Sequence, residues 1–238
     1  MTRGSRHWRE LRVFLALAAA LSAPRGMLHA QDIAYAASLP DLDSTTQVVV
    51  GREIARARER GLPVDPLIAK VREGRLKRAA GARIRAAVEH LSDRLAAARE
   101  ALGTASTPEE VTAGADAIAA GAQPSSLRAV RAASAQPVTA PIGALAQLLA
   151  SGVTETRAME IVLSLLRRNA SPTVLIALAN QVEADVSTGL SAAASAAFRL
   201  RALESRLNAA TAAEAAPGFE NLGGNVNSGT GSPPRRKP

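Results

Sequence analysis

From Ser44 to about Ala213, apolar residues recur with the period of an α-helix almost without a break. The brief interruptions carry residues that end or begin helices. A helix over 44–60 is expected to end at Gly61, and Asp65 is expected to cap the next one with Pro66 at its first position. Thr107-Pro108-Glu109-Glu110 fits a capping box. The pattern therefore predicts an all-α fold whose helices are joined by short turns.

One kind of turn recurs along the chain. Gly121, Gly152 and Gly189 each follow an apolar helical stretch and precede a polar residue that begins the next one, as in an αα-hairpin. A degraded fourth copy is expected at 78–81, with Ile84 in the place of Leu127. The three glycines are 31 and 37 residues apart, so no strict repeat is evident. Two architectures stay open, with the first favoured: an irregular bundle, or a short stack of antiparallel helical hairpins.

The predicted helix over 81–102 carries a coiled-coil type seam, because its apolar residues alternate at steps of four and three. Intramolecular packing is the favoured use of this seam, and a homo-oligomer through 84–102 is the alternative. Leucines after Ala196 repeat the spacing, which makes the two long helices candidates to pack together or against a second chain. The main core is expected between Leu145 and Val186, where apolar residues are densest.

The first thirty residues have the three parts of a secretory signal peptide. Four arginines precede the apolar run over 13–21, which is too short to span a bilayer and is followed by small residues. Cleavage is expected between Ala30 and Gln31, with a second small-x-small site ending at Ala36. The protein is therefore expected to be exported, to the periplasm or the medium, and to keep no transmembrane anchor after cleavage.

Four segments follow from these patterns: a cleaved signal peptide over 1–30, a loose leader over 31–43, a helical domain over 44–216, and a tail over 217–238. The tail is rich in Gly, Asn, Ser and Pro. Such a composition buries too little apolar surface to offset chain entropy, so this tail is expected to be disordered.

Composition argues against most catalytic and cofactor chemistry. The whole chain carries a net charge of +8, and removal of residues 1–30 lowers it to about +4 and leaves His90 as the single histidine, with no cysteine. Zinc sites and Ser/His/Asp catalysis lack residues, aromatic side chains for base stacking are scarce, and no phosphate-binding glycine motif occurs. No cofactor and no nucleic-acid partner is expected, and an enzyme that uses carboxylates alone is the remaining catalytic alternative.

A basic region between Arg52 and Arg85 stands out, with eleven basic residues against four acids. Its candidate contacts with an anionic partner are Arg52, Arg56, Lys70, Arg72, Arg75, Lys77, Arg78, Arg83 and Arg85. The favoured interpretation is a non-catalytic interaction or structural protein of the bacterial cell envelope. The alternative is a binding module for an anionic polymer, an acidic protein face or a lipid surface. An ordinary solvated face is the simplest explanation of the charge.

Overall fold

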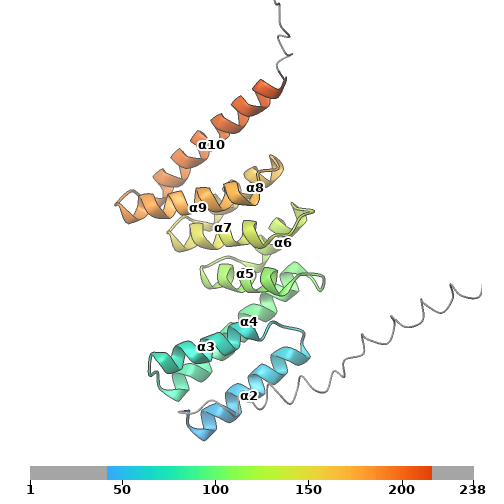
Figure 1. Ribbon diagram of the computed structural model, residues 1–238, viewed down its shortest axis with the longest axis vertical. Coiled ribbons are helices and arrows are strands. Elements are labelled where there is room, and N and C mark those ends of the chain that lie inside the picture. Colours follow the sequence, from blue (N-terminus) through green and yellow to red (C-terminus); the bar gives the residue numbers. More distant parts are fainter. Residues whose placement is uncertain (1–41, 216–238) are drawn as a thin grey trace, which may run out of the picture.

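The computed structural model describes residues 42–215, and over this range the chain forms α-helices and no strands (Figure 1). The signal peptide, both cleavage sites, residues 31–41 of the leader and the tail lie outside the described residues. The helices are α2 (Ser44–Glu59), α3 (Asp65–Leu76), α4 (Gly81–Leu102), α5 (Pro108–Ala119), α6 (Pro124–Ala132), α7 (Thr139–Ala150), α8 (Glu155–Arg167), α9 (Pro172–Ser187) and α10 (Ala192–Ala215). The all-α prediction is confirmed.

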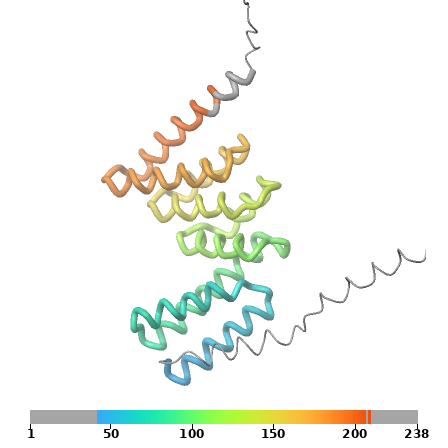
Figure 2. Tube along the Cα trace, viewed as in Figure 1, coloured from blue at the N-terminus to red at the C-terminus, as the bar shows by residue number. Residues whose placement is uncertain are grey.

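The helices form a stack of antiparallel hairpins. Helices α3 and α4, α7 and α8, and α9 and α10 pair along the chain, whereas α6 packs mainly on α4. Helices α5, α7 and α9 pack side by side in one layer (Figure 1). The tube in Figure 2 follows this zigzag from one end of an elongated molecule to the other. Of the two expected architectures, the described residues adopt the hairpin stack.

A turn of constant length joins the two helices of each hairpin. It takes four residues every time, over 77–80, 120–123, 151–154 and 188–191. In the third, Gly152 has φ +89° and the Val153 N–H donates to the Leu148 carbonyl at 3.0 Å, which closes the helix with a left-handed residue. Arg78 takes this position in the first hairpin with φ +50°, so the degraded fourth copy of the turn is present.

The register after each turn is also constant. Six positions beyond the left-handed residue, the side chain is buried in all four hairpins, at Ile84, Leu127, Ala158 and Ser195. In all four hairpins, the second helix therefore buries the residue at the same distance from the turn. Its length then varies, with 22, 9, 13 and 24 residues in α4, α6, α8 and α10.

Helix α4 joins the N-terminal end of the stack to the rest. Among the described helices it is the one that packs extensively on both α2 and α3 and on both α5 and α6. Its seam residues Ile84, Val88, Leu91, Leu95, Ala98 and Leu102 are all buried within the one chain. The seam is thus an intramolecular packing face. The expected pairing of α4 with the last helix is wrong, because α10 packs on α9 instead (Figure 1).

The expected core is found where the apolar residues are densest. Leu145, Leu148, Ile161, Leu165 and Val182 are fully buried. The capping box of Thr107 and Glu110 is confirmed, but Asp65 is not a cap: Val64 holds that position, and Asp65 begins α3 itself. Asp65 lies one residue after the cap, because Pro66 occupies the second helical position. Proline is tolerated there as well as at the first position, so it does not fix where the helix begins.

The starts of α2 and α4 are in close contact. Asp43 caps α2 by accepting from the Thr46 N–H at 2.9 Å, and a Cβ built on Gly81 would overlap the Asp43 carboxylate and the Thr46 hydroxyl. Only a residue without a side chain fits there. These contacts hold the start of α2 against the first turn of α4.

Two glycines, one within α7 and one in the turn that follows it, provide a matched test of the turn. Gly152→Ala should lower the free energy of unfolding by about 1–2 kcal/mol, because a Cβ is strained at its φ of +89°. Gly143→Ala should raise it by about 0.5–1 kcal/mol, since Gly143 lies within the helix with open space around it. Urea denaturation followed by circular dichroism measures both, and equal effects would contradict the turn assignment.

Candidate functional site

The nine candidate basic residues lie at the N-terminal end of the stack, on α2, α3 and α4 (Figure 1). Arg52 and Arg56 are on α2. Lys70, Arg72 and Arg75 are on α3, Lys77 and Arg78 are in the α3–α4 turn, and Arg83 and Arg85 are on α4. The structure brings three of them together at one hollow and places the others elsewhere.

That hollow, which we call the basic hollow, is lined by Leu42, Arg72, Arg75, Leu76, Arg78, Ala79 and Ile84 and has a volume of about 700 Å³. Its lining combines three guanidinium groups with aliphatic side chains, and none of these lining residues is acidic. Leu76 is 85% exposed, which is high for a leucine. The surface is thus both cationic and apolar.

The spacing of the three arginines explains why they meet. Arg72 and Arg75 are three residues apart on α3 and so share one side of the helix. Arg78 follows in the left-handed position of the turn, where the chain reverses toward α4. The hollow thus depends on the hairpin turn as well as on the helix period.

A second group of candidate residues lines a hollow of mixed charge. Arg52, Arg56 and Arg85 line a smaller hollow of about 160 Å³ together with Glu53 and Glu89. Arg56 pairs with Glu53 at 3.0 Å, and the Arg85 guanidinium donates to the Thr46 hydroxyl at 2.5 Å. This hollow thus combines three arginines with two glutamates.

Lys70 and Lys77 are held by one acid. Their ammonium groups lie 2.6 and 2.5 Å from the two carboxylate oxygens of Glu73. The hydrogen bonds from both lysines, with their charges, lower the pKa of Glu73 to about 2. Arg83 is exposed on the first turn of α4. None of these three residues is part of the lining of the basic hollow.

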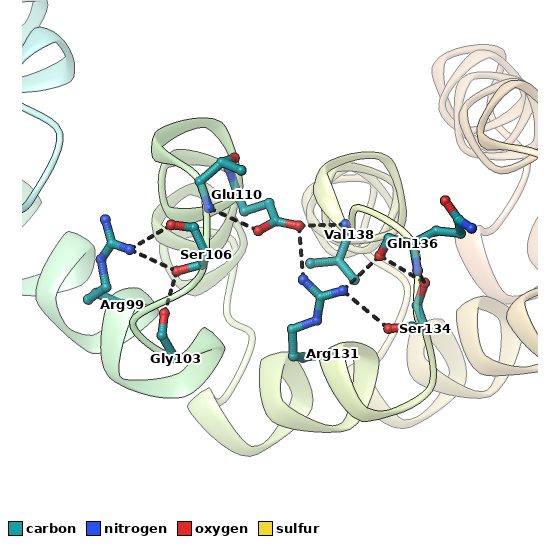
Figure 3. A network of polar contacts seen from close by, with 9 residues as sticks. Arg99, Gly103, Ser106, Glu110, Arg131, Ser134, Gln136 and Val138 are labelled. Atoms are coloured by element: carbon teal, nitrogen blue, oxygen red, sulfur yellow. Dashed lines mark hydrogen bonds and ion pairs between the residues drawn. The ribbon is translucent and has the colours of Figure 1, made fainter. Parts of the chain in front are cut away.

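The acidic residues of the described chain serve mainly as structural ligands. Glu110 is 3% exposed, and its carboxylate accepts from the Val138 N–H at 2.8 Å, the Arg131 guanidinium at 3.0 Å and the Thr107 N–H at 3.0 Å (Figure 3). Burial raises the pKa of Glu110, but these hydrogen bonds outweigh it and the pKa is lowered. Such a carboxylate stays ionised and ties α5, α6 and the start of α7 together.

Arg131 completes this junction. Its second guanidinium nitrogen donates to the carbonyl oxygens of Ser134 at 3.1 Å and Gln136 at 2.7 Å, which fixes the loop between α6 and α7 (Figure 3). Sequence reasoning found the capping role of Glu110 and missed this second role. The signal was present, since a carboxylate at the third helical position has one oxygen left to bind elsewhere.

Two further acids have perturbed pKa values. Asp185 on α9 accepts from Arg199 at 2.6 and 2.8 Å and from the buried Ser195 hydroxyl at 2.6 Å, and these bonds lower its pKa to about 2. Asp116 on α5 has a raised pKa because partial burial outweighs the attraction of Arg94 and Lys70.

A third, apolar hollow of about 600 Å³ lies between the 133–141 segment and the 166–175 segment. Its walls include Pro141, Leu166, Pro172 and Leu175. Sequence analysis did not find this hollow. Much of its lining comes from the α6–α7 and α8–α9 loops, which join successive hairpins, and no local sequence pattern marks it.

Within residues 42–215, no three potential ligands among His, Cys, Asp and Glu gather into a metal site. In the same range, no helix has both the length and the apolar character needed to cross a membrane. His90 is exposed on α4. Comparison of the chain with models of protein families, with curated proteins and with solved structures finds no match.

The junction at Glu110 can be tested by removing its charge. Glu110→Gln should lower the free energy of unfolding by about 2–4 kcal/mol, because the amide cannot accept from all three donors and leaves Arg131 without its counter-charge. Glu100→Gln, at an exposed position of α4, should change it by less than about 0.5 kcal/mol. Urea denaturation at pH 7 compares the two, and similar effects would contradict the junction.

The ion pair of Asp185 on α9 with Arg199 on α10, which we call the clamp, should make the stability of the fold depend on pH in acid. Because the folded pKa of Asp185 is about 2, the clamp contributes fully above the unfolded pKa and is lost as the pH falls from about 4 toward 2. Asp185→Asn should therefore reduce the melting temperature at pH 7 and show a shallower further decrease in acid than the wild type. Thermal melts followed by circular dichroism from pH 7 to pH 2 measure this, and parallel curves would refute it.

Proposed function

We propose that the protein is an exported, non-catalytic interaction protein of the bacterial cell envelope. The observation that carries the proposal is the hairpin stack, in which each hairpin contacts its neighbours in the chain and the body is elongated (Figure 1). Such arrays present a large, continuous surface for partners, because little of it is used to close the fold on itself. Residues 1–30 supply the reason to expect that this surface works outside the cytoplasm.

A second function, binding of an anionic partner, is supported by the basic hollow. Three arginines contribute to its lining, and guanidinium groups bind carboxylates and phosphates with well-defined geometry. The partner chemistry would be that of an anionic envelope polymer, a lipid head group or an acidic protein face.

Export is tested by the N-terminus of the secreted form. With a tag at the C-terminus of the full chain, the envelope fraction should contain a protein that begins at Gln31 and gives a strongly helical spectrum after purification. An uncleaved chain that stays in the cytoplasm would contradict export, and an unordered spectrum would contradict the interaction scaffold.

The anionic function is tested with vesicles that contain phosphatidylglycerol. The protein from Gln31 should co-sediment with them, and the bound fraction should fall as salt is raised, because counterions screen exposed charges. Arg72→Gln, Arg75→Gln and Arg78→Gln together should abolish this binding.

The control removes the same charge elsewhere, as Arg128→Gln, Arg167→Gln and Arg201→Gln at exposed positions of other helices. It should retain most of the binding. Equal losses in both triple variants would mean that net charge alone drives the association, and binding that ignores salt would refute the electrostatic account.

A further inference from the structure

Two turns of the stack are each covered by the start of a later helix. The Gln123 N–H, in the turn over 120–123, donates to the Glu155 carboxylate at the start of α8 at 2.6 Å. In the turn over 151–154, a Cβ at Gly152 would lie 3.8 Å from that of Ala192, at the start of α10. Each of these turns thus contacts the hairpin that follows it. In the described chain, α9 and α10 form the last hairpin, so the turn between them has no such neighbour (Figure 1).

The residue after the left-handed glycine shows what this difference does. Ala122 and Val153 hold this position in the two covered turns, and each is 3% exposed. Leu190 holds it in the last turn and is 48% exposed. A large apolar side chain therefore stands uncovered at a position that is buried in the two preceding turns.

A second position repeats this contrast, nine residues after the left-handed glycine. Val130 on α6 and Ile161 on α8 are fully buried there, whereas Phe198 on α10 is 63% exposed. Arrays of stacked hairpins usually end in a unit whose outer face is polar, which keeps them soluble. The last described hairpin differs, because it keeps apolar residues at positions that the preceding hairpins bury.

A groove of about 220 Å³ between α9 and α10 extends this apolar surface. Phe198 shares a side of α10 with Ala202, four residues on, and Ala202 is part of the groove. Of the two arginines in the lining, Arg199 is held by Asp185 at 2.6 Å. We call Leu190, Phe198 and the groove together the C-terminal face; the groove is lined by Val174, Ala177, Leu178, Gln181, Arg199, Ala202, Leu203 and Arg206.

The charge of this end allows a second copy to dock on it. Residues 172–206 contain three acids and three arginines and so carry no net charge: Glu183, Asp185 and Glu204 against Arg199, Arg201 and Arg206. The region from Arg52 to Arg85, at the other end of the stack, has eleven basic residues against four acids. Two C-terminal faces can therefore meet without net repulsion, whereas two N-terminal ends repel each other.

We propose that the C-terminal face docks on the C-terminal face of a second copy of the chain, which gives a two-fold dimer. The contact continues the stacking of hairpin on hairpin that runs through the molecule, because each copy covers the last hairpin of the other. A two-fold contact uses the same patch on both copies and closes after two chains. The dimer does not depend on the proposed function, since it forms whether or not the protein has another partner.

Sedimentation velocity tests the dimer. The protein purified after expression of the full chain should change from monomer to dimer as its concentration rises from low micromolar to near millimolar, and it should form no larger species. A monomer over this whole range would overturn the proposal. Growth beyond the dimer would also overturn it, because a head-to-tail contact between the two ends of the stack does not close.

Substitutions at exposed positions locate the contact. Phe198→Glu and Leu190→Glu should each weaken dimerisation at least about tenfold, because both place a charge in an apolar interface. Val48→Glu, on a side chain of α2 that is 58% exposed, is the matched control at the other end and should leave the dimer unchanged. Equal weakening by all three would contradict the assigned face. Circular dichroism checks that each variant keeps its helix content.

Hydrogen exchange gives a second readout on the unmodified protein. Backbone amides over 188–203 should exchange several-fold more slowly at a concentration where the dimer dominates than at one where the monomer does. Amides of α2 should exchange at the same rate in both. A dimer whose added protection lies on α2 or α3 instead would overturn the proposal, since the copies would then meet through the N-terminal end.

Discussion

The left-handed residue that closes the first helix of each hairpin is the constraint on which the rest of the structure depends. It makes the chain reverse within four residues, at Arg78, Gly121, Gly152 and Gly189. Because the length of the turn is constant, the second helix always begins in the same register and buries the residue six positions on. A change of one residue in the turn would rotate that face by about 100° and expose it. The stacking of successive hairpins follows from this local geometry.

Sequence reasoning recovered the local elements more fully than their arrangement. Helix ends at Gly61, Gly121 and Gly152 and the start at Thr107 could be predicted, because they depend on backbone freedom and capping within a few residues. The choice between bundle and stack could not be made. The second helices differ from 9 to 24 residues, so the spacing of the turns hides the repeat that the structure contains. The pairing of α10 with α9 includes the ion pair of Asp185 and Arg199, which the apolar pattern does not represent.

The candidate site, too, could be predicted only in part from the sequence. A count of charges located the basic region, but it could not tell which of the basic residues line one hollow. Lys70 and Lys77 are held by Glu73, whereas Arg72, Arg75 and Arg78 meet because a helix face continues into a turn. Charge density along a sequence is an average over faces, and only the fold resolves it. For this reason the site is smaller and more apolar than the nine residues suggested.

Helix α4 connects the N-terminal helices to the later hairpins. Its 22 residues pack on α2 and α3 at one end and on α5 and α6 at the other, and in the described chain no other helix packs extensively on both groups. The position of the cationic end relative to the later hairpins therefore depends on the packing along this one helix. Leu91 and Leu95 are buried in its middle together with the polar Ser92, so a change at these positions would alter how the two ends of the molecule are joined.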